Sequence, residues 1–116
     1  MNINLKKSIL KKQINKYFSS IKKKNFEHLN KVLSKNAKLH DGNIIIVTRQ
    51  NIINFTKKIF FNKKFRIYNQ INLIDPKENI VFSRFFLKID NNKLKIIDEI
   101  HFDKNQKIVK ITVYKY

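Results

Sequence analysis

The sequence predicts an α+β domain in which helices from the first half of the chain pack on one face of an antiparallel sheet from the second half. Two observations lead to this prediction. Apolar residues recur every three or four positions up to residue 60, and they alternate with polar residues from residue 65 onward. Short turn sequences separate the alternating segments, as in consecutive antiparallel strands. The 116 residues are enough for one domain, residues 1–116, with a core of its own.

Three segments of the first half have the spacing of amphipathic helices. The first covers residues 5–23, and a shorter one restarts at Asn25. Thr48 can begin the third, because a threonine oxygen accepts hydrogen bonds from the free N–H groups of a first helical turn. The apolar positions are Leu5, Ile9, Ile14, Tyr17, Phe18 and Ile21 in the first segment, Phe26, Leu29 and Leu33 in the second, and Ile52, Ile53, Phe55, Ile59 and Phe60 in the third.

The predicted strands begin with residues 37–41, which end at the only glycine, Gly42, and therefore at a clear turn. In residues 65–73 we expect Phe65, Ile67, Asn69, Ile71 and Leu73 to share one face. Asn91–Asn92 and Asn105–Gln106 supply the turns between the last strands. Those strands are predicted at residues 80–89, 94–102 and 108–114.

Composition excludes several kinds of protein. The chain has no cysteine, so neither a disulfide nor a thiolate site is available. The longest uninterrupted aliphatic run is Ile44–Val47, far short of a membrane span of about 20 residues. The N-terminus lacks the apolar segment of a signal peptide. We therefore expect a cytoplasmic protein without a membrane partner.

The net charge of +18 suggests nucleic-acid binding, but the basic residues have the wrong character for specific recognition. Only three of the 26 are arginine, the residue favoured for bidentate phosphate contacts. Lysine, asparagine and isoleucine, all with AT-rich codons, make up half of the chain. Genome base composition explains this bias without a partner. We expect nucleic acid to bind only non-specifically.

Asp98 interrupts an otherwise apolar strand face. In the segment LKIIDEIHFD, strand alternation places Leu94, Ile96, Asp98, Ile100 and Phe102 together. A carboxyl group among large apolar neighbours is desolvated, which raises its pKa. A neutral carboxylic acid can donate a hydrogen bond to a developing oxyanion. The alternatives are a bulge or a carboxylate at the rim of the sheet.

Two stretches of the sequence resemble the nuclear transport factor 2-like superfamily, in its SnoaL-like polyketide cyclase and ketosteroid isomerase branches. The first is YFSSIKKKNFEHL, from Tyr17, followed by Leu33, Ala37 and Asp41. The second is the closing segment IIDEIHFDKNQKIVKITVY. The resemblance covers essentially the whole chain. It implies a cone-shaped, strongly curved antiparallel or mixed sheet around three helices, a cystatin-like fold with a pocket inside.

The resemblance also implies site residues. Ketosteroid isomerases use a tyrosine and a protonated aspartic acid as oxyanion donors and a second aspartate as the base. These roles fall on Tyr17, Asp98 and Asp41, respectively. The pocket would hold a small apolar molecule without cofactor or metal. The apolar residues expected to bind this molecule are Phe18, Phe55, Phe85, Ile96 and Ile100.

Other interpretations of these residues stay open. Tyr17 is also compatible with an ordinary core position, and Asp41 with a turn-forming aspartate. The chain departs from the isomerase pattern at His40 beside the base, at Arg84 in a strand that borders the cavity, and in lacking a proline after Asp41. The three histidines do not have metal-ligand spacing. The function is therefore either proton transfer next to a carbonyl or non-catalytic ligand binding or dimerisation on the same fold.

The outer face of the sheet is also apolar. Phe82 and Phe86 lie opposite Phe85 and Leu87 on the strand of residues 80–89, and a core cannot use both faces. We therefore expect a homodimer through the face that carries Phe82 and Phe86.

Overall fold

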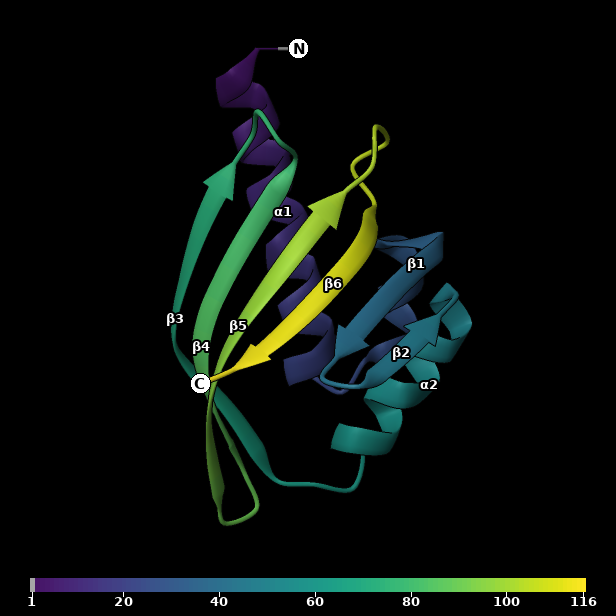
Figure 1. Ribbon diagram of the computed structural model, residues 1–116, viewed down its shortest axis with the longest axis vertical. Helices are drawn as coiled ribbons and strands as arrows, with labels where there is room; N and C mark the ends of the chain where they lie inside the picture. The colour runs from purple at the N-terminus through teal and green to yellow at the C-terminus, as the bar shows by residue number, and fades with distance from the viewer. Residues whose placement is uncertain (1) are drawn as a thin grey trace.

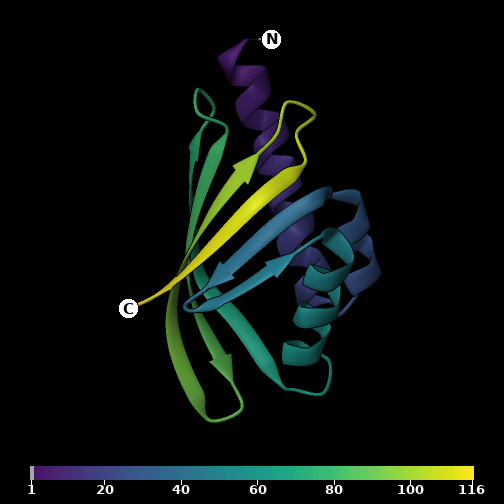
Figure 2. The ribbon, with the colours of Figure 1, turned by 45° about the vertical axis from the view of Figure 1, so that its right-hand side comes forward.

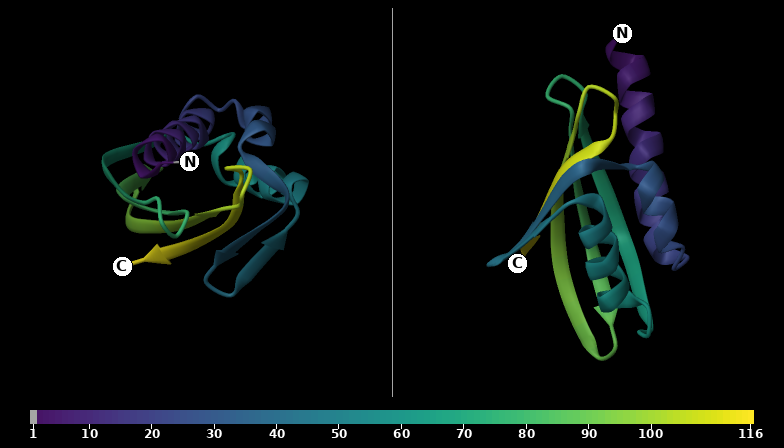
Figure 3. Two further views of the ribbon diagram at one scale, coloured as in Figure 1. Left: turned by 90° about the horizontal axis from the view of Figure 1, so that it is seen from above. Right: turned by 90° about the vertical axis from the view of Figure 1, so that its right-hand side faces the viewer.

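The computed structural model describes residues 2–116 as a six-stranded mixed sheet that curls around three helices (Figure 1). Seen from above, α1 and α2 lie on the inner side of the curved sheet (Figure 3). The elements are α1 (Ile3–Lys22), the 3-10 helix η1 (Phe26–Lys31), β1 (Leu33–Asp41), β2 (Ile44–Val47), α2 (Arg49–Phe60), β3 (Phe65–Asp75), β4 (Ile80–Ile89), β5 (Asn92–Phe102) and β6 (Ile108–Lys115). The predicted α+β class is confirmed, and every predicted helix and strand is present in the predicted order, although Leu33, predicted in the second helix, begins strand β1.

The strand order is β2-β1-β6-β5-β4-β3, with β1 parallel to β6 and every other neighbouring pair antiparallel. The parallel pair joins the first strand of the chain to the last, which makes the sheet mixed. Figure 2 shows the β1–β2 hairpin and α2 beside each other at one end of the sheet. The long helix α1 crosses the remaining strands.

The inner face of the sheet and the apolar side of α1 form the core. On α1 the buried apolar residues recur at helical spacing as expected, although Leu5 is 52% exposed and Leu10, which was not predicted, is fully buried. On β5 the alternation also holds, because Ile96, Asp98, Ile100 and Phe102 are buried while the residues between them are more accessible. The buried apolar residues of α1 are Leu10, Ile14, Tyr17, Phe18 and Ile21.

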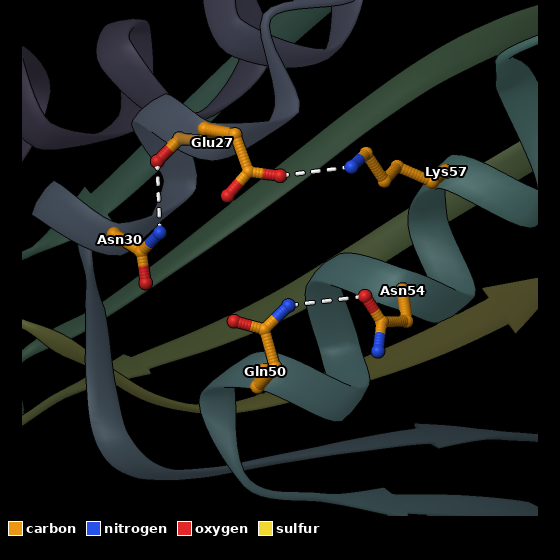
Figure 4. Close-up of polar contacts among 5 residues, drawn as sticks. All are labelled: Glu27, Asn30, Gln50, Asn54 and Lys57. Atoms are coloured by element: carbon orange, nitrogen blue, oxygen red, sulfur yellow. Dashed lines mark hydrogen bonds and ion pairs between the residues drawn. The ribbon is translucent and has the colours of Figure 1, made fainter.

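Helix α2 begins as predicted at Thr48, whose hydroxyl accepts a hydrogen bond from the Asn51 N–H. Thr48 has φ 73° and ψ 147°, a combination that is essentially restricted to glycine. An ion pair joins α2 to η1, with 2.8 Å between Lys57 Nζ and Glu27 Oε1 (Figure 4). Both side chains are exposed, so this pair contributes little to stability.

The first two strands differ from the sequence prediction. The strand predicted at residues 37–41 begins earlier, at Leu33, and Gly42 turns the chain into β2, a strand that was not predicted. Ile44, Ile45 and Val47 remain exposed, because β2 is a short edge strand. An all-aliphatic segment gives no period-2 pattern, so the sequence alone did not identify this strand.

The predicted face of β3 is wrong beyond its middle. The pairing of β3 with β4 shifts register between Tyr68 and Ile71, and Asn69 in this bulge has φ 51°. A bulge inserts one residue, so the side chains after it exchange faces. Ile71 and Leu73 therefore lie on the outer face, 56% and 68% exposed.

The outer face of the sheet is rich in apolar residues. Phe82 and Phe86 lie on the opposite side of β4 from the buried Phe85 and Leu87, as the alternation predicted. Both are half-buried, and Phe86 contacts Tyr68 at 5.4 Å between ring centroids. Among residues 2–116, no helix is long and apolar enough to cross a membrane.

Candidate functional site

A cavity of about 160 Å³ lies between α1, α2 and the inner face of the sheet. Most of its wall is aliphatic or aromatic, and its polar side chains are few. The polar residues of the lining are Tyr17, Asp41, Thr56, Asp98 and Lys115. The apolar residues are Phe18, Ile21, Leu39, Phe55, Ile59, Phe60, Ile67, Phe85, Leu87, Ile89, Leu94, Ile96 and Val113. An apolar cavity with a few convergent polar groups is typical of a small-molecule site.

The structure brings Tyr17, Asp41 and Asp98 into this one cavity. Tyr17 comes from the buried side of α1, three residues after Ile14. Asp41 is the last residue of β1 and Asp98 lies in β5. The three groups are more than 20 positions apart in the chain, and the curvature of the sheet around α1 lets them meet.

The two acids lie in one row across the sheet. Asp41 pairs with Val113 of β6 across the parallel ladder, and Val113 pairs with Asp98 of β5 across the antiparallel one. One strand therefore separates the acids, which corresponds to about 10 Å between their backbones. Residues in register project to the same face, so both carboxyl groups lie on the inner face of the sheet.

Burial makes Asp98 an unusual acid. It is 6% exposed, and the loss of solvent raises its pKa from the ordinary 3.8 to about 7, with a further increase from the like charge of Asp41. Within the described part of the chain, no hydrogen bond to the carboxylate offsets this rise. A large part of the Asp98 population is therefore protonated at neutral pH and can donate a hydrogen bond.

Tyr17 is 5% exposed, and its ring packs edge-on against Phe18 at 5.0 Å. Burial, together with the nearby charge of Asp98, raises the pKa of the Tyr17 hydroxyl. The hydroxyl therefore keeps its proton and remains a hydrogen-bond donor. Tyr17 and Asp98 together supply two donors to one region of the cavity.

Asp41 has a different environment. Its side chain is 18% exposed, and Oδ1 lies 3.3 Å from Nζ of Lys115, the second residue after Val113 on β6. The carboxylate thus keeps contact with solvent and has a cationic partner, whereas Asp98 is buried and has no such partner among residues 2–116. The same cavity holds two acids in two distinct environments.

Four of the five apolar residues expected to bind a ligand line the cavity: Phe18, Phe55, Phe85 and Ile96. Phe18 and Phe85 contact each other edge-on at 5.3 Å between ring centroids. Ile100 is not part of the lining and is fully buried in the core. It is on the same face as Ile96, but further along β5, where it belongs to the hydrophobic core.

A polar cluster continues the row beyond Asp98. Ser83 of β4 pairs with Asp98 and is fully buried, and Asn72 of β3 pairs with Ser83. The Ser83 hydroxyl donates to Asn72 Oδ1 at 2.7 Å and accepts from Gln70 Nε2 at 2.9 Å. The bulge at Asn69 turns Gln70 and Asn72 inward, so the sequence alternation could not reveal this cluster.

Two of the three departures noted from the isomerase pattern, His40 and Arg84, lie away from the cavity. His40 alternates with Leu39 and Asp41 along β1, so it belongs to the opposite face of the sheet. Arg84 is exposed on the outer face of β4. Across residues 2–116, no group of three or more His, Asp or Glu residues is placed to hold a metal ion.

Several lining residues were not predicted, and Lys115 is the most important of them. Strand alternation from Ile111 and Val113 would have placed Lys115 on the inner face. It was not identified because lysine is so frequent in this sequence that a single one carries little signal. Thr56 and Phe60 of α2 also line the cavity, on a helix whose docking position the sequence does not determine.

The sequence matches no family model, and no curated protein resembles it significantly. Solved structures do resemble the fold. An NTF2-like protein of unknown function from Burkholderia xenovorans superposes with a TM-score of 0.79 at 12% identity, covering 96% of this chain and 85% of that one. A steroid delta-isomerase from Pseudomonas aeruginosa superposes with a TM-score of 0.75 at 17% identity, covering 93% and 80%.

Other matching structures include proteins whose names refer to ketosteroid isomerases and polyketide cyclases. A de novo designed protein with a curved β-sheet also matches, with a TM-score of 0.77, 17% identity and coverage of 94% and 86%. At such low identity these matches establish the fold and leave the activity open. The chain therefore has the cone-shaped nuclear transport factor 2-like fold that the sequence resemblance implied.

Proposed function

We propose that this protein binds a small apolar carbonyl compound in the cavity and catalyses proton transfer at the carbon next to the carbonyl, as ketosteroid isomerases do. One observation carries the proposal: two carboxyl groups in different environments line the same cavity as the Tyr17 hydroxyl. Asp98 is buried and has a raised pKa, whereas Asp41 is in contact with solvent. Titratable groups whose environments differ in this way are typical of acid–base sites.

In this mechanism the ligand oxygen accepts hydrogen bonds from Tyr17 and from protonated Asp98. The Asp41 carboxylate removes a proton from the adjacent carbon, and the electron pair of the broken C–H bond moves into the carbonyl to form an enolate. The two donors stabilise the negative oxygen. Asp41 then returns its proton to carbon, which regenerates the carbonyl or its isomer. The apolar lining excludes water and strengthens these hydrogen bonds.

The size of the cavity restricts the ligand. A cavity of about 150 Å³ holds a molecule the size of benzene, and this one is about 160 Å³. A steroid would extend well outside it. The proposed substrate is therefore a monocyclic or short aliphatic carbonyl compound. The comparison with ketosteroid isomerases concerns the mechanism and does not extend to a steroid substrate.

Non-catalytic ligand binding is the second candidate. It is favoured by the ion pair with Lys115, which occupies the carboxylate of the proposed base. It is also favoured by the match to a designed protein, because the fold can exist without an evolved reaction. Activity and binding measurements on the same variants separate the two candidates.

Isomerisation of 3-cyclohexenone to the conjugated 2-cyclohexenone tests the proposal, because the product absorbs in the ultraviolet and both molecules fit the cavity. Wild type should accelerate the reaction above the buffer rate, and Asp41→Asn should abolish that acceleration. Asp98→Ala should lower kcat about 100- to 1,000-fold, as expected for losing one oxyanion donor. Asp98→Asn keeps a donor and should be less affected.

Asp90→Asn is the matched control, because it removes an exposed carboxyl that is outside the cavity lining. Its rate should equal that of wild type. If wild type binds 2-cyclohexenone but does not accelerate the reaction, the protein is a binding module. If it also fails to exchange the α-protons of cyclohexanone with deuterium from solvent, the catalytic proposal is wrong.

A further inference from the structure

Lys115 gives the cavity a charged residue that the proposed reaction does not use. It is the only cationic side chain among the cavity-lining residues of the described chain, although 26 residues of the sequence are Lys or Arg. It lies near the end of β6 on the same face as Val113, and its side chain is 53% exposed. Lys115 therefore stands where the cavity meets solvent.

The ion pair with Asp41 leaves Lys115 able to bind another group. An ammonium group has three N–H donors. The distance of 3.3 Å to Asp41 Oδ1 is longer than the 2.7–2.9 Å typical of a strong charge-assisted hydrogen bond, and at most one or two donors are used. At least one donor remains free for a second anion.

The charges around Lys115 indicate which charge a ligand of this cavity carries. The Asp41 carboxylate lines the cavity, and it would repel an anionic ligand in the absence of a cation. A neutral apolar ligand offers no charge for this ammonium group to bind, whereas a ligand carboxylate does. The net charge of +18 also attracts anions to the protein from a distance.

We propose that Lys115 binds a carboxylate of the ligand at the entrance of the cavity, so that the ligand is a small keto acid with its ketone at Tyr17 and Asp98. This inference rests on the proposed carbonyl site and adds the chemical class of the substrate.

The sheet register gives the length of this ligand. Lys115 pairs with Ile96 across the β5–β6 ladder, and Ile96 is two residues from Asp98 on the same face. One strand spacing combined with a two-residue rise places the backbones of Lys115 and Asp98 about 8 Å apart. Four methylene groups between ketone and carboxylate bridge most of this distance. The structure therefore favours a medium-length keto acid over an α-keto acid.

The probes are 6-oxoheptanoate, which has this spacing, and its uncharged analogue 6-oxoheptanamide. Binding is measured by NMR titration of the methyl groups of Ile96 and Val113, which report on the cavity wall. Wild type should bind the acid about fivefold more tightly than the amide, the size expected for a half-exposed ion pair. Both compounds carry the same ketone and chain, so the ratio isolates the charged group.

Three variants locate the effect. Lys115→Met keeps most of the aliphatic stem and should lose the preference for the acid, while Lys115→Arg should retain it. Lys110→Met is the matched control, because Lys110 is an exposed lysine of the same strand that is outside the cavity lining. This control should behave as wild type.

The outcomes separate this inference from the proposed function. Equal binding of acid and amide by wild type overturns the role of Lys115 but leaves the carbonyl site standing. If Lys110→Met loses the preference for the acid to the same extent as Lys115→Met, the preference comes from the net positive charge of the protein, and the role of Lys115 is again overturned. If neither compound shifts the cavity resonances, the carbonyl site itself is wrong, and the keto acid fails with it.

Discussion

Replacing Asp98 with asparagine should stabilise the protein, and the gain should grow with pH. The pKa of Asp98 is raised from 3.8 to about 7 in the folded state, chiefly by burial. Below about pH 4 the carboxyl is protonated in both folded and unfolded chains, so its ionisation contributes nothing. Between about pH 4 and pH 7 the unfolded chain loses this proton while the folded protein keeps it. Rising pH therefore reduces the contribution of Asp98 to the stability of wild type across this interval.

The size of the effect follows from the difference in pKa. About three pH units, at about 1.36 kcal/mol per unit, correspond to about 4 kcal/mol by pH 7. This is an upper value, because the site can relax or admit water when Asp98 ionises. Asparagine has nearly the same shape and never ionises, so Asp98→Asn should recover most of this free energy. The gain is large compared with a typical domain stability of about 5–15 kcal/mol.

Equilibrium unfolding in urea at several pH values between 4 and 8 measures the effect. The quantity compared is the free energy of unfolding of Asp98→Asn minus that of wild type, because contributions of other acids cancel in this difference. It should rise between pH 4 and pH 7 and then level off. Asp90→Asn, an exposed carboxyl, is the reference for a replacement of the same kind. A difference that stays constant over the whole range would show that Asp98 is solvated, and the oxyanion mechanism would lose its neutral acid.

Three further predictions concern other parts of the molecule. Wild type should form a homodimer through the outer face of the sheet, and replacing Phe82 and Phe86 with lysine should give a folded monomer; light scattering that finds wild type monomeric at micromolar concentration contradicts this. Affinity for DNA or RNA should fall steeply with salt and differ little between sequences, so a tight sequence-selective complex at physiological salt would refute non-specific binding. Thr48→Gly should stabilise the protein by about 1 kcal/mol, because glycine adopts the positive φ of this position without strain. Thr48→Ala should destabilise the protein, because it removes the helix cap. If thermal unfolding shows Thr48→Ala to be more stable than Thr48→Gly, the backbone of Thr48 is not strained.

Part of the candidate site could be predicted because it depends on local periodicity. The alternation along β5 placed Asp98 among Ile96 and Ile100, and burial follows directly from that position. The helical spacing along α1 placed Tyr17 on the buried side of its helix in the same way. The resemblance to the nuclear transport factor 2-like superfamily then connected these residues with Asp41, and the structure places all three in one cavity.

Other features depend on local irregularities of the backbone, such as a β-bulge, which the alternation of apolar and polar residues does not reveal. The bulge at Asn69 exchanges the faces of the second half of β3, which exposes Ile71 and Leu73 and buries the Ser83 cluster. Asparagine tolerates positive φ, but the sequence contains too many asparagines for one of them to mark a bulge. The faces of this strand could therefore be assigned only from its pairing with β4.

The sequence by itself determined the fold class, the order of all elements except β2, and the two buried polar groups Tyr17 and Asp98, because these follow from the repeat of side chains along single helices and strands. Only the tertiary structure decided that the cavity measures about 160 Å³, that Ile100 is not part of its lining and that Lys115 pairs with Asp41 at its entrance. The physical reason is that these properties depend on the curvature of the sheet and the docking of α2, which arise from contacts between segments far apart in the chain.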